Sequence, residues 1–129
     1  MSRTVDIPEE TKKILGRWYD RKILDETPVL RGSLFGAIFG ISKQHAVTIN
    51  RTVHLTSHAP DPDTPLGIML LGHELFHVVH QMELGWWRYL IRYLAGWRPS
   101  HISNGRNHPM ERPAYERGDQ LWRAMQPPD

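Results

Sequence analysis

Residues 70–81 read LLGHELFHVVHQ, and they place three histidines and one glutamate inside an apolar stretch. Apolar residues continue on both sides at helical spacing, from Thr64, which a proline follows, to about Leu84, which a glycine follows. Thr-Pro is a typical helix start, and glycine is a typical helix end. The pattern therefore predicts one long helix on which His73 and His77, four residues apart, point in the same direction.

Residues 73–77 form the pattern HExxH, in which each polar residue has its own chemical task. Two imidazole nitrogens from successive turns can bind one Zn²⁺ at about 2.0–2.1 Å. Glu74 lies about 100° around the helix from His73, so its carboxylate can reach a water on the metal without binding the metal. Zinc lowers the pKa of that water toward ~7, and Glu74 takes the proton as general base during attack on a carbonyl.

A buried helix whose histidines bind backbone or side-chain groups is the alternative interpretation. In a chain of this composition, HExxH is expected by chance roughly 0.03 times. The motif also lies in the middle of the predicted helix between apolar residues, as a metal site requires. The sequence therefore favours metal binding at His73 and His77 over a metal-free helical core.

A zinc site of this kind needs a third protein ligand, and His80 is the nearest candidate in the sequence. His80 shares the helix face of His73 and His77, but three ligands on one straight helix would span about 10 Å, too long for one ion. The longer pattern HExxHxxGxxH is absent, because Glu83 occupies its last position. His80 is therefore expected beside the metal, where it contacts a ligand or lines the cleft.

The segment 108–125 offers a better third ligand, because its helical phase separates two glutamates. Its apolar face comprises Ala114, Gly118, Leu121, Trp122 and Met125. Glu111 is in register with this face, whereas Glu116 lies among polar residues. Pro113 fits only in a first turn, so the helix is expected either to begin near residues 110–112 or to be kinked there. We therefore expect Glu111 to point inward as the ligand. A solvated carboxylate at a helix N-terminus is the competing interpretation.

The remaining segments complete a small α+β domain that is mostly helical. Residues 46–50 and 52–56 are rich in β-formers and predict two short strands that could pair as a hairpin before the HExxH helix. Further elements are expected over residues 7–19 (helix), 33–41 (buried helix or strand), 86–97 (helix) and 98–109 (loop). In the helix 86–97, one face carries Trp86, Leu90, Tyr93 and Trp97. We favour a core stripe for this face over a roof on the site or a partner or membrane surface.

Composition limits the classes of function. The chain has 129 residues, no cysteine and a net charge of +2, which is too small and scattered to suggest nucleic acid. The first residues have no apolar segment behind their charges, and no apolar run reaches the ~20 residues that span a bilayer. We therefore expect a single domain over residues 1–129, made in the cytoplasm and exported, if at all, without a cleaved leader.

The stretch AVTINRTVHLTSHAPDPDTPLGIMLLGHELFHVVHQ, followed later by HPMERPAYERG, resembles the eCIS core domain family. These are small HExxH proteins, described as zinc metallopeptidases, that are associated with bacterial extracellular contractile injection systems and toxin loci. The resemblance covers residues 46–125, after an N-terminal helix and lead-in over 1–45. It implies a gluzincin-like (zincin) fold, one Zn²⁺, a peptide or protein substrate, and an injection-system or toxin-delivery partner that could carry the chain out of the cell.

Carried over by position, His73 and His77 match the family's histidine ligands, Glu74 the catalytic base and Glu111 the third ligand. The resemblance also suggests residues 52–56 as an edge strand that holds extended substrate. His54 and His58, on and beside that strand, are either cleft residues or exposed polar residues.

Two positions depart from the family pattern. His80 stands where glutamine is common, and Tyr115 stands where a gluzincin usually has an aspartate that orients a ligand histidine. Loss of that carboxylate would weaken metal affinity or activity ~10–100-fold. Tyr115 could bond the same imidazole, stabilise an oxyanion or simply pack in the core.

Three functions are consistent with these residues. The first is a zinc-dependent peptidase, including a delivered toxin or effector. The second is a weakly active or inactive zincin-like module that binds or builds part of an injection or toxin system. The third is a metal-free helical domain.

Overall fold

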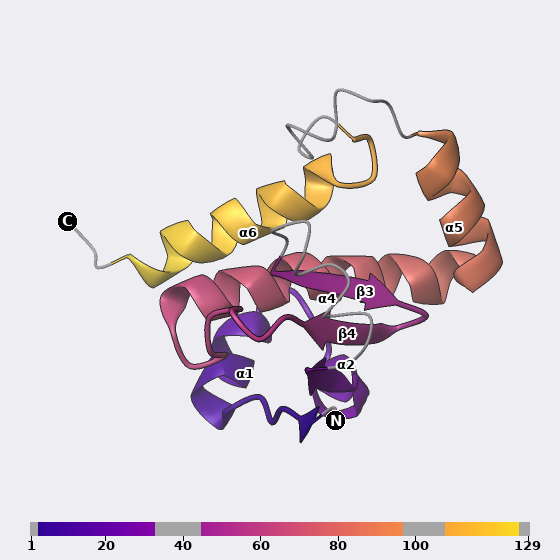
Figure 1. Ribbon diagram of the computed structural model, residues 1–129. Helices are drawn as coiled ribbons and strands as arrows, with labels where there is room; N and C mark the ends of the chain where they lie inside the picture. The colour runs from indigo at the N-terminus through magenta and orange to yellow at the C-terminus, as the bar shows by residue number, and fades with distance from the viewer. Residues whose placement is uncertain (1–2, 33–44, 97–107, 127–129) are drawn as a thin grey trace.

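The computed structural model describes residues 3–32, 45–96 and 108–126. Within these residues, five helices and a small mixed sheet of four strands form an α+β fold, which confirms the predicted class at this level (Figure 1). The predicted segment 33–41 and most of the predicted loop 98–109 lie outside the described residues. The elements are β1 (Arg3–Thr4), α1 (Glu9–Leu15), α2 (Arg21–Glu26), β2 (Val29–Arg31), β3 (Ala46–Ile49), β4 (Thr52–Leu55), α4 (Pro65–Leu84), α5 (Trp86–Ala95) and α6 (Arg112–Met125).

The N-terminal region differs from its prediction, because two short helices replace the single helix expected over residues 7–19. Pro8 precedes the first helical residue of α1, and the helix ends before Gly16. The turn that follows lets both Leu15 and Tyr19 enter the core, and the Tyr19 hydroxyl donates to the carbonyl of Gly72 on α4. Burial of two side chains from this turn therefore outweighs continuation of the helix.

The sheet has the strand order β1–β2–β4–β3. β2 and β4 are parallel, and the other pairs are antiparallel. The predicted hairpin is confirmed: β3 and β4 pair through a two-residue turn in which Asn50 has φ 47° and Arg51 has φ 66°. The side chain of Gln81 on α4 holds this turn, since its Oε1 accepts from the Arg51 N–H at 2.6 Å and its Nε2 donates to the Thr48 carbonyl at 3.0 Å.

The strand order corrects the expected position of residues 52–56 at the sheet edge. β4 has a partner on each side, so residues 52–56 do not form an edge strand. Among the described strands, β3 forms the edge on the side of α4, and it carries Thr48, whose hydroxyl reaches α4.

The long helix α4 lies at the centre of the fold and matches its prediction. The Thr64 hydroxyl caps its start by accepting from the Gly67 N–H at 3.1 Å, and Gly85 ends it with φ 81°. Its apolar side fills the core with Leu71, Leu75 and Val78, each at most 1% exposed. Burial of this size stabilises by about 1.5–3 kcal/mol for each side chain, so apolar packing holds α4 in place.

α6 lies along α4, as Figure 1 shows. The two helices approach closely because Gly72 has no side chain: a Cβ there would lie 1.8 Å from Cδ1 of Leu121. Pro113 falls in the first turn of α6, as predicted, and Ala114 and Leu121 are fully buried. Trp122 was placed on the same face but is 39% exposed, so the buried stripe of α6 is narrower than predicted.

Candidate metal centre

The HExxH residues occupy the middle of α4. His73, Glu74 and His77 do not belong to the hydrophobic core cluster. His73 and His77 lie one turn apart, and their rings meet edge to face with centroids 5.1 Å apart. Their side chains are only 13% and 5% exposed. The rigid, capped helix therefore presents both imidazoles to one small volume, as the spacing predicted.

Glu111 reaches this volume from the residue that precedes α6. Its Oε1 lies 2.6 Å from Nε2 of His77 and 3.1 Å from Nε2 of His73. The three side chains each offer one ligand atom, and these atoms all lie within 4.8 Å of one another. Sequence separations of 38 and 34 residues are thus closed by the packing of α6 on α4.

This group fits a zinc ion by its chemistry. Two imidazole nitrogens and one carboxylate oxygen are a common zinc donor set, with a fourth position left for water or substrate. Metal–ligand distances of about 2.0–2.2 Å in a tetrahedron put ligand atoms roughly 3.3 Å apart. The observed separations of 2.6 and 3.1 Å need to grow by less than about 1 Å to admit the ion. The cluster could therefore bind a metal without rearrangement of the helices.

The electrostatics of the same atoms favour a charged carboxylate. Burial raises the pKa of Glu111, but hydrogen bonds from His73 and His77 outweigh burial and hold that pKa well below its ordinary value. Burial lowers the pKa of His77, whereas the hydrogen bond and charge of Glu111 raise it more, so the net shift is upward. In the absence of metal, a proton on His77 thus partly replaces the positive charge that this carboxylate favours.

Glu74 is buried, with 5% exposure, and does not belong to the ligand group. Its Oε2 accepts a hydrogen bond of 2.7 Å from the Thr48 hydroxyl on the edge strand β3. Its negative charge also contributes, after Glu111, to the raised pKa of His77. The hydrogen bond fixes one carboxylate oxygen of Glu74 against the edge strand.

α5 contacts two of the candidate ligands through tyrosine hydroxyls, and these two contacts were not predicted. The Tyr89 hydroxyl lies 2.9 Å from Nδ1 of His77, and the Tyr93 hydroxyl donates to Oε2 of Glu111 at 2.8 Å. Of the predicted face, Trp86, Leu90 and Tyr93 are half-buried, and Trp97 lies outside the described residues. None of the three described residues belongs to the main core cluster, and the Tyr93 hydroxyl contacts a candidate ligand. For the described residues of this face, the core-stripe interpretation is therefore wrong, and the contacts with the candidate ligands favour the roof interpretation.

The comparisons with known proteins bear on this site. The eCIS core domain family matches residues 6–85, which is more than half of the chain. The chain belongs to the eCIS core domain family. Among curated proteins and solved structures, none matches the chain. In the described part of the chain, no helix combines the length and apolar character that a membrane crossing requires.

The eCIS core match begins earlier than the resemblance suggested, since it includes α1 and α2. It ends at residue 85, immediately before α5. The HExxH motif and Thr48 lie inside the match, whereas Glu111 and the two tyrosines of α5 lie outside it. The family match therefore covers His73, Glu74 and His77, whereas only the geometry of the structure brings Glu111 to them.

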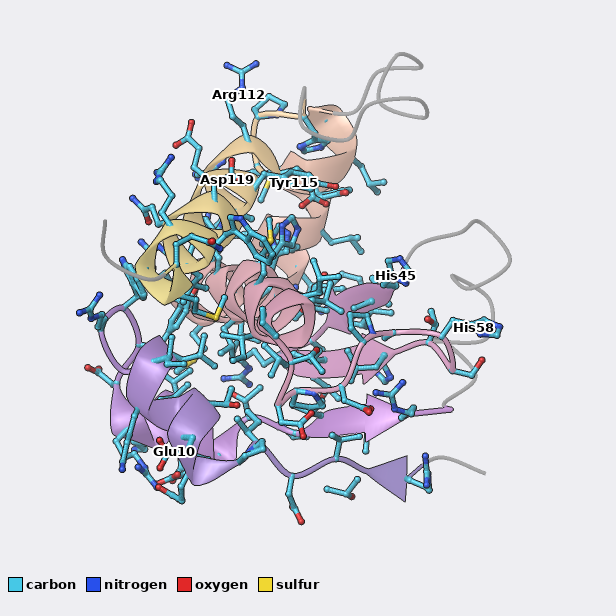
Figure 2. The ribbon with its side chains drawn as sticks, turned by 90° about the vertical axis from the view of Figure 1, so that its left-hand side faces the viewer. Glu10, His45, His58, Arg112, Tyr115 and Asp119 are labelled. Carbon is cyan, nitrogen blue, oxygen red and sulfur yellow. The ribbon has the colours of Figure 1, made fainter. Side chains whose placement is uncertain are left out.

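The two positions that depart from the eCIS core pattern both lie beside the ligands. The Tyr115 ring packs edge to face on the His73 ring, with centroids 4.4 Å apart (Figure 2 labels Tyr115 on α6). His80 does not join the ligand group, and its ring packs on the Tyr89 ring at 5.5 Å. Within the described residues, the buried Nδ1 of His80 has no hydrogen-bond partner. Burial, followed by the charge of His77, lowers the pKa of His80, which favours a neutral ring.

The other two candidate histidines, His54 and His58, do not join the ligand group. His54 is 7% exposed and pairs with Val47 and Leu30, and alternation along the strands puts it on the sheet face opposite to Thr48. His58 is exposed at the end of the sheet, away from Tyr115 (Figure 2). His54 therefore fits neither earlier expectation, and His58 is an exposed polar residue.

Proposed function

We propose that this chain is a zinc-dependent peptidase of the gluzincin-like type, folded as one domain. One Zn²⁺ would be held by His73, His77 and Glu111. The observation that carries the proposal is the convergence of two imidazole Nε2 atoms and one carboxylate oxygen within 4.8 Å, with the glutamate of HExxH beside them. A metal-free helical domain has no need for this arrangement of buried charge.

Each residue of the site has a role in this reaction. A bound Zn²⁺ would supply a Lewis acid that polarises a peptide carbonyl and makes water acidic near neutral pH. Glu74 would accept the proton of the attacking water and later deliver it to the leaving amine, a role typically worth 10²–10⁴-fold in rate. Thr48 keeps one oxygen of Glu74 occupied at 2.7 Å, so the other oxygen is the one available for proton transfer.

The biological setting follows from the family. Membership of the eCIS core family associates the chain with extracellular contractile injection systems. A peptidase in that setting would act on a peptide or protein substrate, as an effector or toxin delivered outside the cell. Its partner would then be a component of the injection apparatus.

The test of the proposed reaction is Glu74→Gln. This change keeps the shape of the side chain and an oxygen for Thr48, but it removes the base. Zinc content is expected to stay at one ion per chain, and cleavage of a peptide library is expected to fall at least about 100-fold. Glu83→Gln is the matched control, because Glu83 is an exposed glutamate on the same helix. Equal cleavage by Glu74→Gln and wild type would refute the assignment.

A second candidate is a zincin-like module that binds zinc but works by binding a partner. The observation in its favour is Tyr115, whose ring contacts His73 where a gluzincin usually has an orienting aspartate. Wild type that retains one zinc ion and cleaves no peptide under any condition would support this candidate over the peptidase.

A further inference from the structure

Two phenol groups on α5 each contact a different proposed ligand, one turn of helix apart. We propose that Tyr89 and Tyr93 are positioning residues that orient His77 and Glu111 for metal binding. They would do the work that an orienting carboxylate does elsewhere. This inference rests on the proposed zinc site, and it adds two residues outside the family match to the groups on which metal affinity depends.

Tyr89 acts on the far nitrogen of His77. The hydroxyl lies 2.9 Å from Nδ1, while Nε2 of the same ring faces Glu111. A neutral imidazole that offers the Nε2 lone pair to a metal carries its proton on Nδ1, and that proton needs an acceptor. The phenol oxygen of Tyr89 is that acceptor, so it fixes both the tautomer and the rotation of the ring.

Tyr93 orients the other ligand, Glu111, but as a hydrogen-bond donor. Its hydroxyl donates to Oε2 of Glu111 at 2.8 Å, whereas Oε1 points at the two imidazoles. One carboxylate oxygen is thereby engaged by the phenol, and the other is presented to the ion.

The tyrosines are themselves held in place by a run of stacked rings. Tyr89 stacks on Tyr93 with centroids 6.0 Å apart, and Tyr93 stacks on His108 at 4.2 Å. The Met110 N–H donates to Nδ1 of His108 at 3.0 Å, so Nε2 carries the proton and donates to the Tyr93 carbonyl at 2.7 Å. His108 thus ties α5 to the segment that bears Glu111 and closes a ring of contacts around that ligand.

Packing alone does not explain these hydroxyls. Phenylalanine at 89 and 93 would keep the stacked rings, so ring stacking does not require the hydroxyl groups. The two hydroxyls instead end on Nδ1 of His77 and Oε2 of Glu111, the atoms of those ligands that face away from the metal position.

The experiment compares Tyr89→Phe and Tyr93→Phe with wild type in the full chain. The control is Tyr19→Phe, which also removes a buried phenol bonded to α4 but leaves the ligands untouched. Zn²⁺ affinity is measured by competition with a chromogenic chelator, and the visible spectrum of the Co²⁺ form reports ligand geometry. We expect each α5 variant to bind Zn²⁺ about 10–100-fold more weakly with an altered Co²⁺ spectrum. Tyr19→Phe should lower only the melting temperature.

Two outcomes would overturn the inference: wild-type affinity in both α5 variants, or an equal loss in Tyr19→Phe. Should a variant fail to fold, nitrogen shifts of His77 in the zinc-bound wild type decide instead. The inference requires coordination through Nε2 and a slowly exchanging proton on Nδ1. The zinc proposal fails separately, if wild type binds no zinc or if His77→Ala and Glu111→Ala retain it.

Discussion

Two helices meet at Gly85, and they are held in the molecule by different forces. α4 buries Leu71, Leu75 and Val78 in the main core, so its position follows from apolar packing. α5 has Tyr89 as its single buried residue and leaves Trp87, Ile91 and Leu94 between 63% and 72% exposed. α5 is therefore attached chiefly through the polar and ring contacts that its tyrosines make at the metal centre.

The difference separates folding from site assembly. Changes on the core side of α4 should reduce the stability of the fold, and the site should be lost when the fold is lost. Changes on the inner side of α5 should alter the site while the fold remains, because little core area is lost. Substitutions matched between the two helices can therefore break or sharpen the comparison.

The largest expected effect is that of Leu75→Ala, which removes a side chain with no exposure from the core side of α4. The free energy of unfolding should fall by about 2–5 kcal/mol, through lost burial and the cavity left behind. Ile91→Ala is the matched change on α5, where the side chain is 65% exposed, and it should cost within about 0.5 kcal/mol. Urea titration of both variants measures this, and similar losses would contradict the comparison.

A smaller effect is expected for Thr48→Val, which removes the donor to Oε2 of Glu74 while keeping the shape of the side chain. Because Glu74 is buried, loss of this donor should cost about 1–3 kcal/mol of stability. The control is Thr52→Val, on the opposite face of the same hairpin. Thermal melts compare the two variants, and an unchanged melting temperature in Thr48→Val would show that the polar side of α4 is not tied to the sheet.

The smallest effect concerns pH. The raised pKa of His77 stabilises the metal-free fold below 6.5 and is lost as pH rises through the folded value, which lies above 6.5. The lowered pKa of Glu111 stabilises above 4.5 and is lost as pH falls through its folded value. The pair thus contributes most between pH 4.5 and 6.5.

Zinc must displace the proton on His77, so zinc should raise the melting temperature more at pH 8 than at pH 6. Melting curves with zinc and with chelator at both pH values measure this difference. A zinc-induced shift that is the same at both pH values would contradict the proposed competition.

The sequence predicts α4 well because its signals are local. A Thr-Pro cap, apolar spacing and a final glycine lie within the helix itself, and all three recur in the structure. The hairpin is predicted for the same reason. The prediction of Glu111 as a ligand required one further step. Helical phase put Glu111 in register with the inner face of the last helix, and the packing of α6 on α4 brings it to His73 and His77.

The contributions that were missed are non-local. β4 was expected at the edge of the sheet, but it pairs with β2 and so lies inside the sheet. No pattern within residues 52–56 reveals this pairing. Tyr93 was read as part of an apolar stripe, although its hydroxyl donates to Glu111 across the site. The α1–α2 break arises from the contact of Tyr19 with a carbonyl of α4. In each case the deciding partner lies far away in the chain.

The most direct test of the central claim is the zinc content of the purified chain beside three single variants. We expect one ion per chain in wild type and in His80→Ala, and loss of the ion in His77→Ala and Glu111→Ala. Full zinc in Glu111→Ala together with loss in His80→Ala would contradict the assigned ligands.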